Sequence, residues 1–107
     1  MTQIAIVGLA CLFPGARTPQ EFWEVLAGGK QTTSDATAAE IGVDPAHFYS
    51  ADQNRADTSY FLHGGYVRGF EVDPTLNDLD RGVNWTVQVA RAALAETTVN
   101  RRRTGML

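Results

Sequence analysis

The feature that most constrains this chain is its opening run, Ile4 to Val7, which is short, apolar, rich in β-branched residues and followed by Gly8. A continuous apolar run, unlike an alternating one, is typical of a strand covered on both faces, as in a parallel sheet. Phe13-Pro14-Gly15 then predicts a turn, because proline removes a backbone donor and glycine permits a sharp change of direction. The opening therefore predicts a buried strand of an α/β fold, with neighbouring strands and two covering layers.

The segment after this strand predicts a helix that ends at Gly28-Gly29. Thr18 can cap the free N–H groups, Pro19 suits the first helical position, and Glu21 completes a capping box. One face of this helix is apolar and consists of Phe22, Val25 and Leu26, with Trp23 beside it.

A long irregular excursion follows. Residues 30–39 are small and polar and predict a surface loop, and the polar stretch 50–59 predicts another. Between them, Asp44-Pro45 predicts a turn or a helix start before the aromatic pair Phe48-Tyr49. Residues 60–70 combine aromatic residues with three glycines, which favours a short twisted strand or a hairpin arm.

From Leu79 to Leu94 the apolar residues recur at spacings of three and four, which predicts a second helix. Trp85, Val89 and Ala92 add a second apolar stripe, and a helix apolar on two sides is usually buried between layers. Gly82 weakens the first turn by ~1 kcal/mol relative to alanine. Residues 101–103 are three arginines at the exit of the helix, and residues 104–107 predict the start of another strand. If that strand pairs with the opening strand, a right-handed parallel crossover connects them.

The composition describes an ordinary globular protein: 107 residues, 44% hydrophobic, 20% charged and a formal net charge of −3. That charge gives no electrostatic reason to expect nucleic acid or an anionic membrane as a partner. One cysteine excludes an internal disulfide and any multi-cysteine metal site. The first residues lack the basic region of a signal peptide and no apolar run reaches the ~20 residues of a membrane span, so the expected compartment is the cytosol.

No catalytic constellation is visible. Cys11 is the one thiol and His47 and His63 are the imidazoles, but Cys11 ends an apolar run and is interpreted as a small buried thiol. Gly8 and Gly15 do not form the G-x-G-x-x-G turn of a dinucleotide site, because bulky residues stand where glycine is required. The arginines at 101–103 are interpreted as a solvated helix exit.

The acidic residues do not form the spaced loop of a calcium site and are interpreted as caps, turn residues and solvated charges. They are Asp44, Asp52, Asp57, Asp73, Asp78 and Asp80. Asn84-Trp85-Thr86 matches a glycosylation acceptor, but it lies within the predicted helix and is interpreted as a chance match. The sequence thus predicts neither a cofactor nor a metal.

The opening Ile4-Ala5-Ile6-Val7-Gly8-Leu9-Ala10-Cys11-Leu12-Phe13-Pro14-Gly15-Ala16 resembles the start of a β-ketoacyl synthase (ketosynthase) domain of a polyketide synthase. The residues from Thr18 to Gly29 are similar to the family's P-E-E-F-W-x-x-L-x-x-G segment. Gly64-Gly65-Tyr66-Val67 with Val72-Asp73-Pro74 resembles its G-G-F-L…V-D-x-F region. Trp85 to Leu94 is similar to its W-E-A-L helix, and residues 103–106 resemble the start of its R-T-G-V-F-V-G strand.

The sequence also departs from the family pattern. Leu12 stands where the family usually has arginine, and the segment from Pro74 to Leu79 is shorter than in the family. Ala56 to Tyr60 and Leu79-Asp80-Arg81 resemble a bacterial subgroup that builds polyunsaturated fatty acids or long glycolipid chains.

The resemblance implies the N-terminal portion of a thiolase-like layered α/β/α fold, incomplete in residues 1–107, from an enzyme that condenses acyl and malonyl-type thioesters with loss of carbon dioxide. Family ketosynthases use a cysteine in a D-T-A-C-S-S-like elbow and two histidine motifs, and none of these occurs here. Cys11 matches the family's opening cysteine, which is not its nucleophile. His47 and His63 match neither catalytic histidine. We therefore expect no catalytic residue, and no condensing activity from this chain alone.

The implied partners are the remainder of a ketosynthase or synthase polypeptide, an acyl carrier protein bound through the full domain, and a second copy, because the family is usually homodimeric. A standalone non-catalytic module that pairs with a synthase is the alternative, and a small nucleotide-binding α/β protein is a third reading. Residues 4–7 are too apolar to have one face in water, so we expect the chain alone to be molten or ordered only through a partner.

Overall fold

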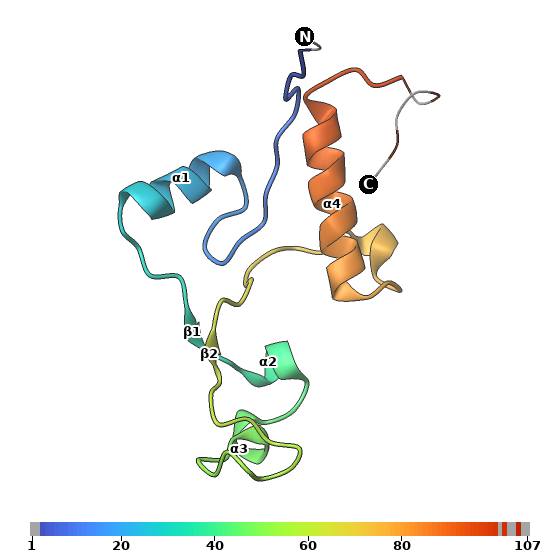
Figure 1. Ribbon diagram of the computed structural model, residues 1–107. Coiled ribbons are helices and arrows are strands. Elements are labelled where there is room, and N and C mark those ends of the chain that lie inside the picture. The colour runs from blue at the N-terminus through green and yellow to red at the C-terminus, as the bar shows by residue number, and fades with distance from the viewer. Residues whose placement is uncertain (1–2, 101, 103–104, 106–107) are drawn as a thin grey trace.

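The computed structural model describes residues 3–100, 102 and 105. The predicted strand at residues 104–107, its parallel crossover and most of the arginine triplet lie outside these residues. The described chain contains α1 (Pro19–Ala27), β1 (Ser34–Asp35), α2 (Ala38–Ile41), α3 (Pro45–Phe48), β2 (His63–Gly64), the 3-10 helix η1 (Pro74–Leu76) and α4 (Arg81–Ala95). Figure 1 shows the excursion that carries α2 and α3 hanging below α1 and α4.

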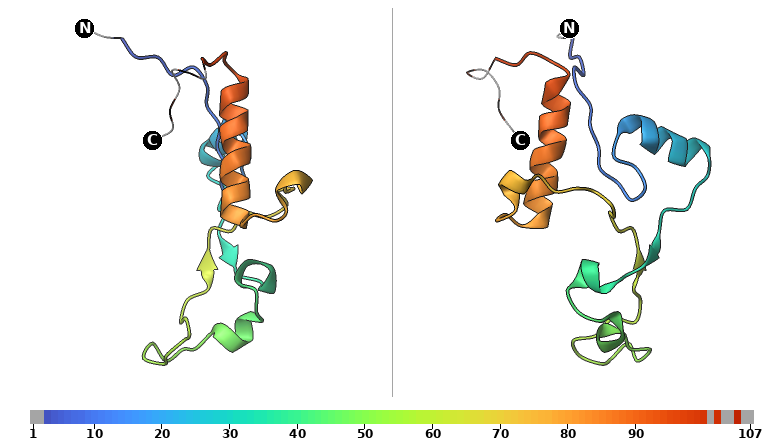
Figure 2. Two further views of the ribbon diagram at one scale, coloured as in Figure 1. Left: turned by 90° about the vertical axis from the view of Figure 1, so that its right-hand side faces the viewer. Right: turned by 180° about the vertical axis from the view of Figure 1, so that it is seen from behind.

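The opening segment is not a strand in this structure, so the prediction for Ile4 to Val7 is wrong for the described chain. Its residues are extended without ladder pairing, and it runs between α1 and α4 (Figures 1 and 2). Ile4 is 93% exposed and Ile6 is 86% exposed. A strand exists only through its neighbours, and no described segment offers Ile4–Val7 a parallel ladder.

Helix α1 begins and ends where its sequence predicts. The hydroxyl of Thr18 accepts a hydrogen bond from the N–H of Glu21 (3.1 Å), and Pro19 is the first helical residue. The carboxylate of Glu21 accepts from the N–H of Arg17 (2.6 Å) instead of that of Thr18, so the predicted capping box is only half formed. At the other end, Gly29 has φ 57° and the N–H of Lys30 reaches the carbonyl of Val25 (3.0 Å), which is a Schellman ending.

The excursion contains more local structure than its polar sequence predicts. Thr37 and Glu40 form a capping box at the start of α2. Thr37 lies inside the segment expected to be a loop, and Glu40 follows that segment directly. Asp44 caps α3, as predicted from Asp44-Pro45. The strand expected within residues 60–70 is β2, which pairs with β1 antiparallel and with Asp35 opposite His63. This small sheet closes the base of the excursion.

Helix α4 confirms the second helix prediction but not its burial. Asp80 caps it through the N–H of Gly82 (2.8 Å), so Gly82 lies within the first turn. Val83 is 48% exposed and Leu94 is 46% exposed, and of its residues only Asn84 is buried. The two apolar stripes of α4 therefore lack the second covering layer that the pattern requires.

Very little apolar surface is buried within the described chain. Its buried hydrophobic residues are Ala16 and Ala36. The radius of gyration is 18.3 Å, whereas a compact domain of 107 residues has about 13 Å. The accessible surface is 8866 Å², and a compact monomer of 11.6 kDa exposes about 5,800 Å². The excess surface on this one chain, about 3,000 Å², exceeds the roughly 1,000–2,500 Å² that each partner contributes to a typical obligate interface.

Candidate functional site

The exposed apolar surface gathers along the opening segment and the two helices that flank it. We call it the assembly surface, and its most exposed members are Ile4, Ile6, Val7, Leu9, Trp23, Leu26, Val83 and Leu94. Large exposed apolar residues that gather in one region of a protein commonly mark a site of association. The excursion carries its own exposed aromatic residues, such as Tyr60 and Phe61, away from this surface.

A groove of about 440 Å³ lies between the opening segment and α1. The rings of Phe13 and Phe22 contact each other with their centroids 4.6 Å apart, and this contact holds the helix against the segment. The groove is lined by Leu9, Ala10, Cys11, Phe13, Pro19, Phe22, Trp23 and Leu26. Every one of these side chains is apolar or weakly polar, so the groove suits another apolar segment of protein.

A second groove, of about 550 Å³, follows α4 and is lined by Leu12, Gly82, Trp85, Thr86, Val89, Ala90 and Ala93. The opening segment is held close to the same helix at Gly8, where a Cβ would overlap the carbonyl oxygen of Ala93. The N–H of Leu9 donates to the carboxylate of Glu96 (3.3 Å) just beyond the helix. Gly8 thus serves close approach to a helix, and Leu12 contributes an apolar wall where the family usually has arginine.

The thiol and the imidazoles do not come together in the described structure. Cys11 is half-buried in the groove beside α1, and His47 lies on α3 at the far end of the molecule (Figure 1). Both ring nitrogens of His63 are engaged elsewhere, Nδ1 with the carboxylate of Asp35 (2.8 Å) and Nε2 with the hydroxyl of Thr33 (3.1 Å). A thiol activated by histidine needs direct hydrogen-bond contact, and no such contact exists here.

The acidic residues behave largely as the sequence predicts. Asp44, Asp73 and Asp80 cap α3, η1 and α4. Asp52 accepts from the N–H of Asn54 (3.0 Å), and Asp57 adopts a left-handed conformation in a turn. Within the described residues, no group of three or more His, Cys, Asp or Glu side chains could hold a metal ion.

Asn84 is fully buried, which argues against its use as a glycosylation acceptor. Its Nδ2 donates to the carbonyl of Leu76 (3.1 Å), and its Oδ1 accepts from the side chain of Gln88. The amide thereby ties η1 to α4 across the short segment from Pro74 to Leu79. This tie gives the segment a defined local structure.

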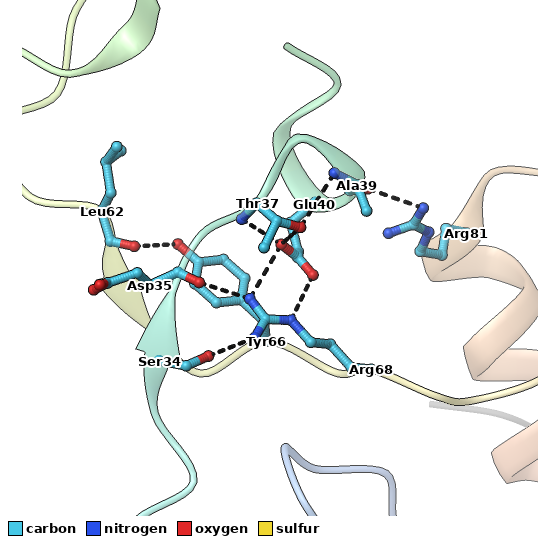
Figure 3. Close-up of polar contacts among 9 residues, drawn as sticks. All are labelled: Ser34, Asp35, Thr37, Ala39, Glu40, Leu62, Tyr66, Arg68 and Arg81. Carbon is cyan, nitrogen blue, oxygen red and sulfur yellow. Dashed lines mark hydrogen bonds and ion pairs between the residues drawn. The ribbon is translucent and has the colours of Figure 1, made fainter. Parts of the chain in front are cut away.

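A network of polar contacts around Arg68, which we call the polar node, joins the outgoing and returning segments of the excursion and is shown in Figure 3. Arg68 donates to both carboxylate oxygens of Glu40, Nε to Oε1 at 2.7 Å and Nη2 to Oε2 at 3.2 Å. It also donates to the hydroxyl of Ser34 (2.8 Å) and the carbonyl of Asp35 (2.7 Å). Bidentate pairing of this kind is among the stronger and more directional polar contacts in proteins.

The electrostatics of this node follow from its hydrogen bonds. The Arg68 guanidinium, followed by the hydroxyl and the N–H of Thr37, lowers the pKa of Glu40 from 4.5 to about 2. The same contact with Glu40 raises the pKa of Arg68. Neither residue stands out in the sequence as a functional candidate. The spacing Thr37-x-x-Glu40 could have indicated the helix, but no local pattern indicates Arg68 as the partner of Glu40.

The family can now be identified. The model of the "Beta-ketoacyl synthase, N-terminal domain" family matches residues 1–105. The chain belongs to the β-ketoacyl synthase family. A solved structure, "PfaC Keto synthase-Chain length factor", superposes with a TM-score of 0.80 at 36% sequence identity and covers 86% of this chain. The predicted fold class, an incomplete N-terminal portion of a thiolase-like α/β fold, is therefore confirmed.

Relatives of this β-ketoacyl synthase chain are large synthases. It is 35% identical over 78 residues to the polyketide synthase GfsA of Streptomyces halstedii, covering 71% of this chain. It is 34% identical over 99 residues to a polyunsaturated fatty acid synthase polypeptide of Thraustochytrium, covering 91% of this chain.

This β-ketoacyl synthase chain spans only a small part of each of these proteins. It covers 1% of GfsA, 4% of the Thraustochytrium synthase polypeptide and 11% of the solved PfaC chain.

Among the described helices, none combines the length and hydropathy that crossing a bilayer requires.

Proposed function

We propose that this chain is the N-terminal structural part of a β-ketoacyl-[acyl carrier protein] synthase, which condenses an acyl thioester with a malonyl-type carrier thioester. The observation that carries the proposal is the family match over residues 1–105 together with the close superposition on a ketosynthase. In this role the chain supplies scaffold, and residues 1–107 are one fragment of a larger domain.

The chemistry is assigned to other parts of the synthase. A condensing enzyme needs a nucleophilic thiol with an activating imidazole, and Cys11 lies in an apolar groove without such a partner. The two ring nitrogens of His63 form hydrogen bonds with Asp35 and Thr33. We accordingly assign no catalytic, cofactor or metal role to any residue of this chain.

The partner of the assembly surface is the remainder of the ketosynthase domain. About 3,000 Å² of excess surface and the uncovered stripes of α4 support a partner that is more polypeptide of the same domain. Through the completed domain the enzyme would meet an acyl carrier protein and form the homodimer usual in the family. We place it in the cytosol, without nucleic acid or membrane as partner.

The printed names of the relatives support a proposal for the substrate class. Proteins named as polyketide and polyunsaturated fatty acid synthases both occur among them, and the solved neighbour is named as a keto synthase–chain length factor. Growing acyl chains of the polyketide or polyunsaturated fatty acid type are therefore the substrates we propose for the complete domain.

A standalone module that pairs with a synthase is the second candidate, and the ordered excursion favours it. Capped helices α2 and α3 and the Arg68–Glu40 pair give residues 33–70 local structure through contacts within the segment itself. Such a module would bind an intact synthase and would not complete a domain.

Reconstitution separates the two candidates. The chain is incubated with an acyl thioester and a malonyl carrier thioester, alone and with a polypeptide containing the rest of a ketosynthase domain, and products are followed by mass spectrometry. We expect no condensed product from the chain alone, product from the mixture, and no change with Cys11→Ala. Condensed product from the chain alone, lost in Cys11→Ala, would overturn the proposal. Binding to an intact synthase without reconstituted activity favours the module.

A further inference from the structure

A cleft of about 440 Å³ lies between α2, the strand-like segment after β2, and the start of α4. We call it the Arg81 cleft; its lining residues are Thr37, Ala39, Glu40, Val67, Arg68, Gly69, Phe70, Val72, Arg81 and Trp85. We infer that the Arg81 cleft binds a side-chain carboxylate, carried between apolar residues on a polypeptide that covers this face of the molecule. The inference rests on the proposed function in taking the occupant to be another polypeptide segment.

Arg81 is the cation available for this contact. One of its Nη2 hydrogens reaches the carbonyl of Ala39 (3.2 Å), and its guanidinium lies 6.0 Å from the ring centre of Trp85 (Figure 3 shows the first contact). Among the described residues, no carboxylate lies within ion-pair distance of Arg81. A guanidinium has five N–H donors, so most of those of Arg81 remain open to a ligand.

The other charges of the cleft compensate each other. Glu40 pairs with Arg68, which also donates hydrogen bonds to the hydroxyl of Ser34 and the carbonyl of Asp35. The nearby carboxylate of Asp80 caps the N–H of Gly82. Arg81 is also the first residue of α4, a 15-residue helix whose N-terminus carries partial positive charge. The lining residues Glu40, Arg68 and Arg81 therefore give the cleft a net charge of +1, with Arg81 the one unpaired, while the carboxylate of Asp80 lies outside this lining at the start of α4.

The other lining residues of the cleft indicate which kind of residue should flank the bound carboxylate. Val67, Phe70, Val72 and Trp85 give the cleft an apolar wall, which a small hydrated anion would leave uncovered. Trp85 also lines the groove along α4, so the cleft adjoins that apolar groove. Arginine and tryptophan together are typical anchors at the centres of protein interfaces. An acidic residue with apolar neighbours on a polypeptide fits all of these features.

A peptide titration of the complete chain tests the inference without using any other part of a synthase. The probes are a short capped peptide with a central Asp between leucines, its Asn counterpart, and inorganic phosphate. The reporters are the indole N–H signals of the two tryptophans in a 15N-labelled sample, Trp85 in the cleft and Trp23 in the groove beside α1. The variants are Arg81→Gln and Arg81→Lys, with exposed Arg55→Gln as the matched control. Helix content of each variant is measured first by circular dichroism.

We expect the Asp peptide to shift the Trp85 signal, with Trp23 unchanged and the Asn peptide bound roughly tenfold more weakly. Arg81→Gln should abolish the shift, Arg81→Lys should weaken it, and Arg55→Gln should leave it intact. Equal shifts from both peptides, a shift from phosphate as large as from the Asp peptide, or no shift at all would overturn the inference. The titrations are performed at a concentration at which sedimentation shows a monomer. A Trp85 shift on concentrating the chain that Arg81→Gln abolishes assigns the cleft to a second copy and also overturns the inference. If Arg81→Gln loses helix, the comparison of Arg81→Lys with Arg55→Gln decides.

Discussion

The guanidinium of Arg68 forms two hydrogen bonds with the carboxylate of Glu40, although the two residues lie 28 positions apart in the sequence. Glu40 belongs to α2, at the start of the excursion, and Arg68 lies four residues after β2, on its return. Together with the pairing of Asp35 and His63, the contact holds the two limbs of the excursion together. The excursion is thus closed at its base by polar contacts, since almost no apolar core lies there.

Replacing Arg68 with lysine should loosen the excursion, because an ammonium group cannot reproduce the bidentate contact or reach Ser34 and Asp35 at the same time. We expect faster proteolysis and faster amide exchange within residues 36–62, with exchange in α1 unchanged. Arg55→Lys, in the loop of the same excursion, is the matched control. Equal protection in Arg68→Lys and the unmodified chain would show that the pair is dispensable.

The Arg68–Glu40 contact has a defined pH dependence. Because hydrogen bonds from Arg68 and Thr37 lower the pKa of Glu40 from 4.5 to about 2, the contact contributes fully above pH 4.5 and is lost as the pH falls towards 2. A carboxyl 13C titration of Glu40 should have its midpoint near pH 2. Arg68→Gln should move the midpoint up towards 4.5, though not fully, since Thr37 remains. A midpoint near 4.5 in the unmodified chain would contradict the described geometry.

Adding a methyl group at Gly8 should release the opening segment from α4, because the new Cβ would overlap the carbonyl oxygen of Ala93. Overlap of this kind costs ~1–3 kcal/mol. Amide exchange at Leu9, whose N–H donates to Glu96 just beyond α4, should therefore accelerate severalfold in Gly8→Ala. Gly105→Ala is the control, since a Cβ there meets nothing within 4 Å. Unchanged exchange at Leu9 in Gly8→Ala would mean that the segment does not pack on α4.

Asn84→Ala should weaken the junction between η1 and α4. The substitution leaves the carbonyl of Leu76 without its side-chain partner and removes a buried amide, at a cost of about 1–3 kcal/mol. Amide exchange at Leu79, whose N–H bonds the same carbonyl (3.0 Å), should become faster. Gln88→Ala, which removes only the outer partner of Asn84, should have a smaller effect. Equal effects of the two variants would contradict the assigned role of Asn84.

Local signals in the sequence predicted α1, α3 and α4, although α2 begins within a segment expected to be a loop. Thr18-Pro19 and Gly28-Gly29 mark α1, Asp44-Pro45 marks α3, and the apolar spacing marks α4, because caps, turns and periodicity act within a few residues. The pairing of Arg68 with Glu40 could not be predicted in this way. It depends on the path of the chain between them, which no local pattern encodes.

The opening segment is the opposite case. Its local pattern predicts a strand, but whether that strand forms depends on polypeptide far away in the sequence. Ile4 to Val7 has the composition of a buried parallel strand, yet the described segment has no paired neighbour and remains exposed. The same holds for α4, whose two apolar stripes indicate two covering layers. In both elements the pattern of apolar residues predicts the buried environment of a completed domain. The proposed partner would supply that environment.

The central claim, that the assembly surface requires more polypeptide, is tested most directly by the unfolding of the isolated chain. Calorimetry is performed on a sample shown by sedimentation at low concentration to be monomeric. At ~25 cal/mol per Å², an excess of several hundred Å² of exposed apolar surface forfeits on the order of 10 kcal/mol, comparable to the ~5–15 kcal/mol that stabilises a whole domain. We expect a broad, non-cooperative transition or association of the chain. A sharp cooperative transition from the monomer would contradict the claim and favour the standalone module.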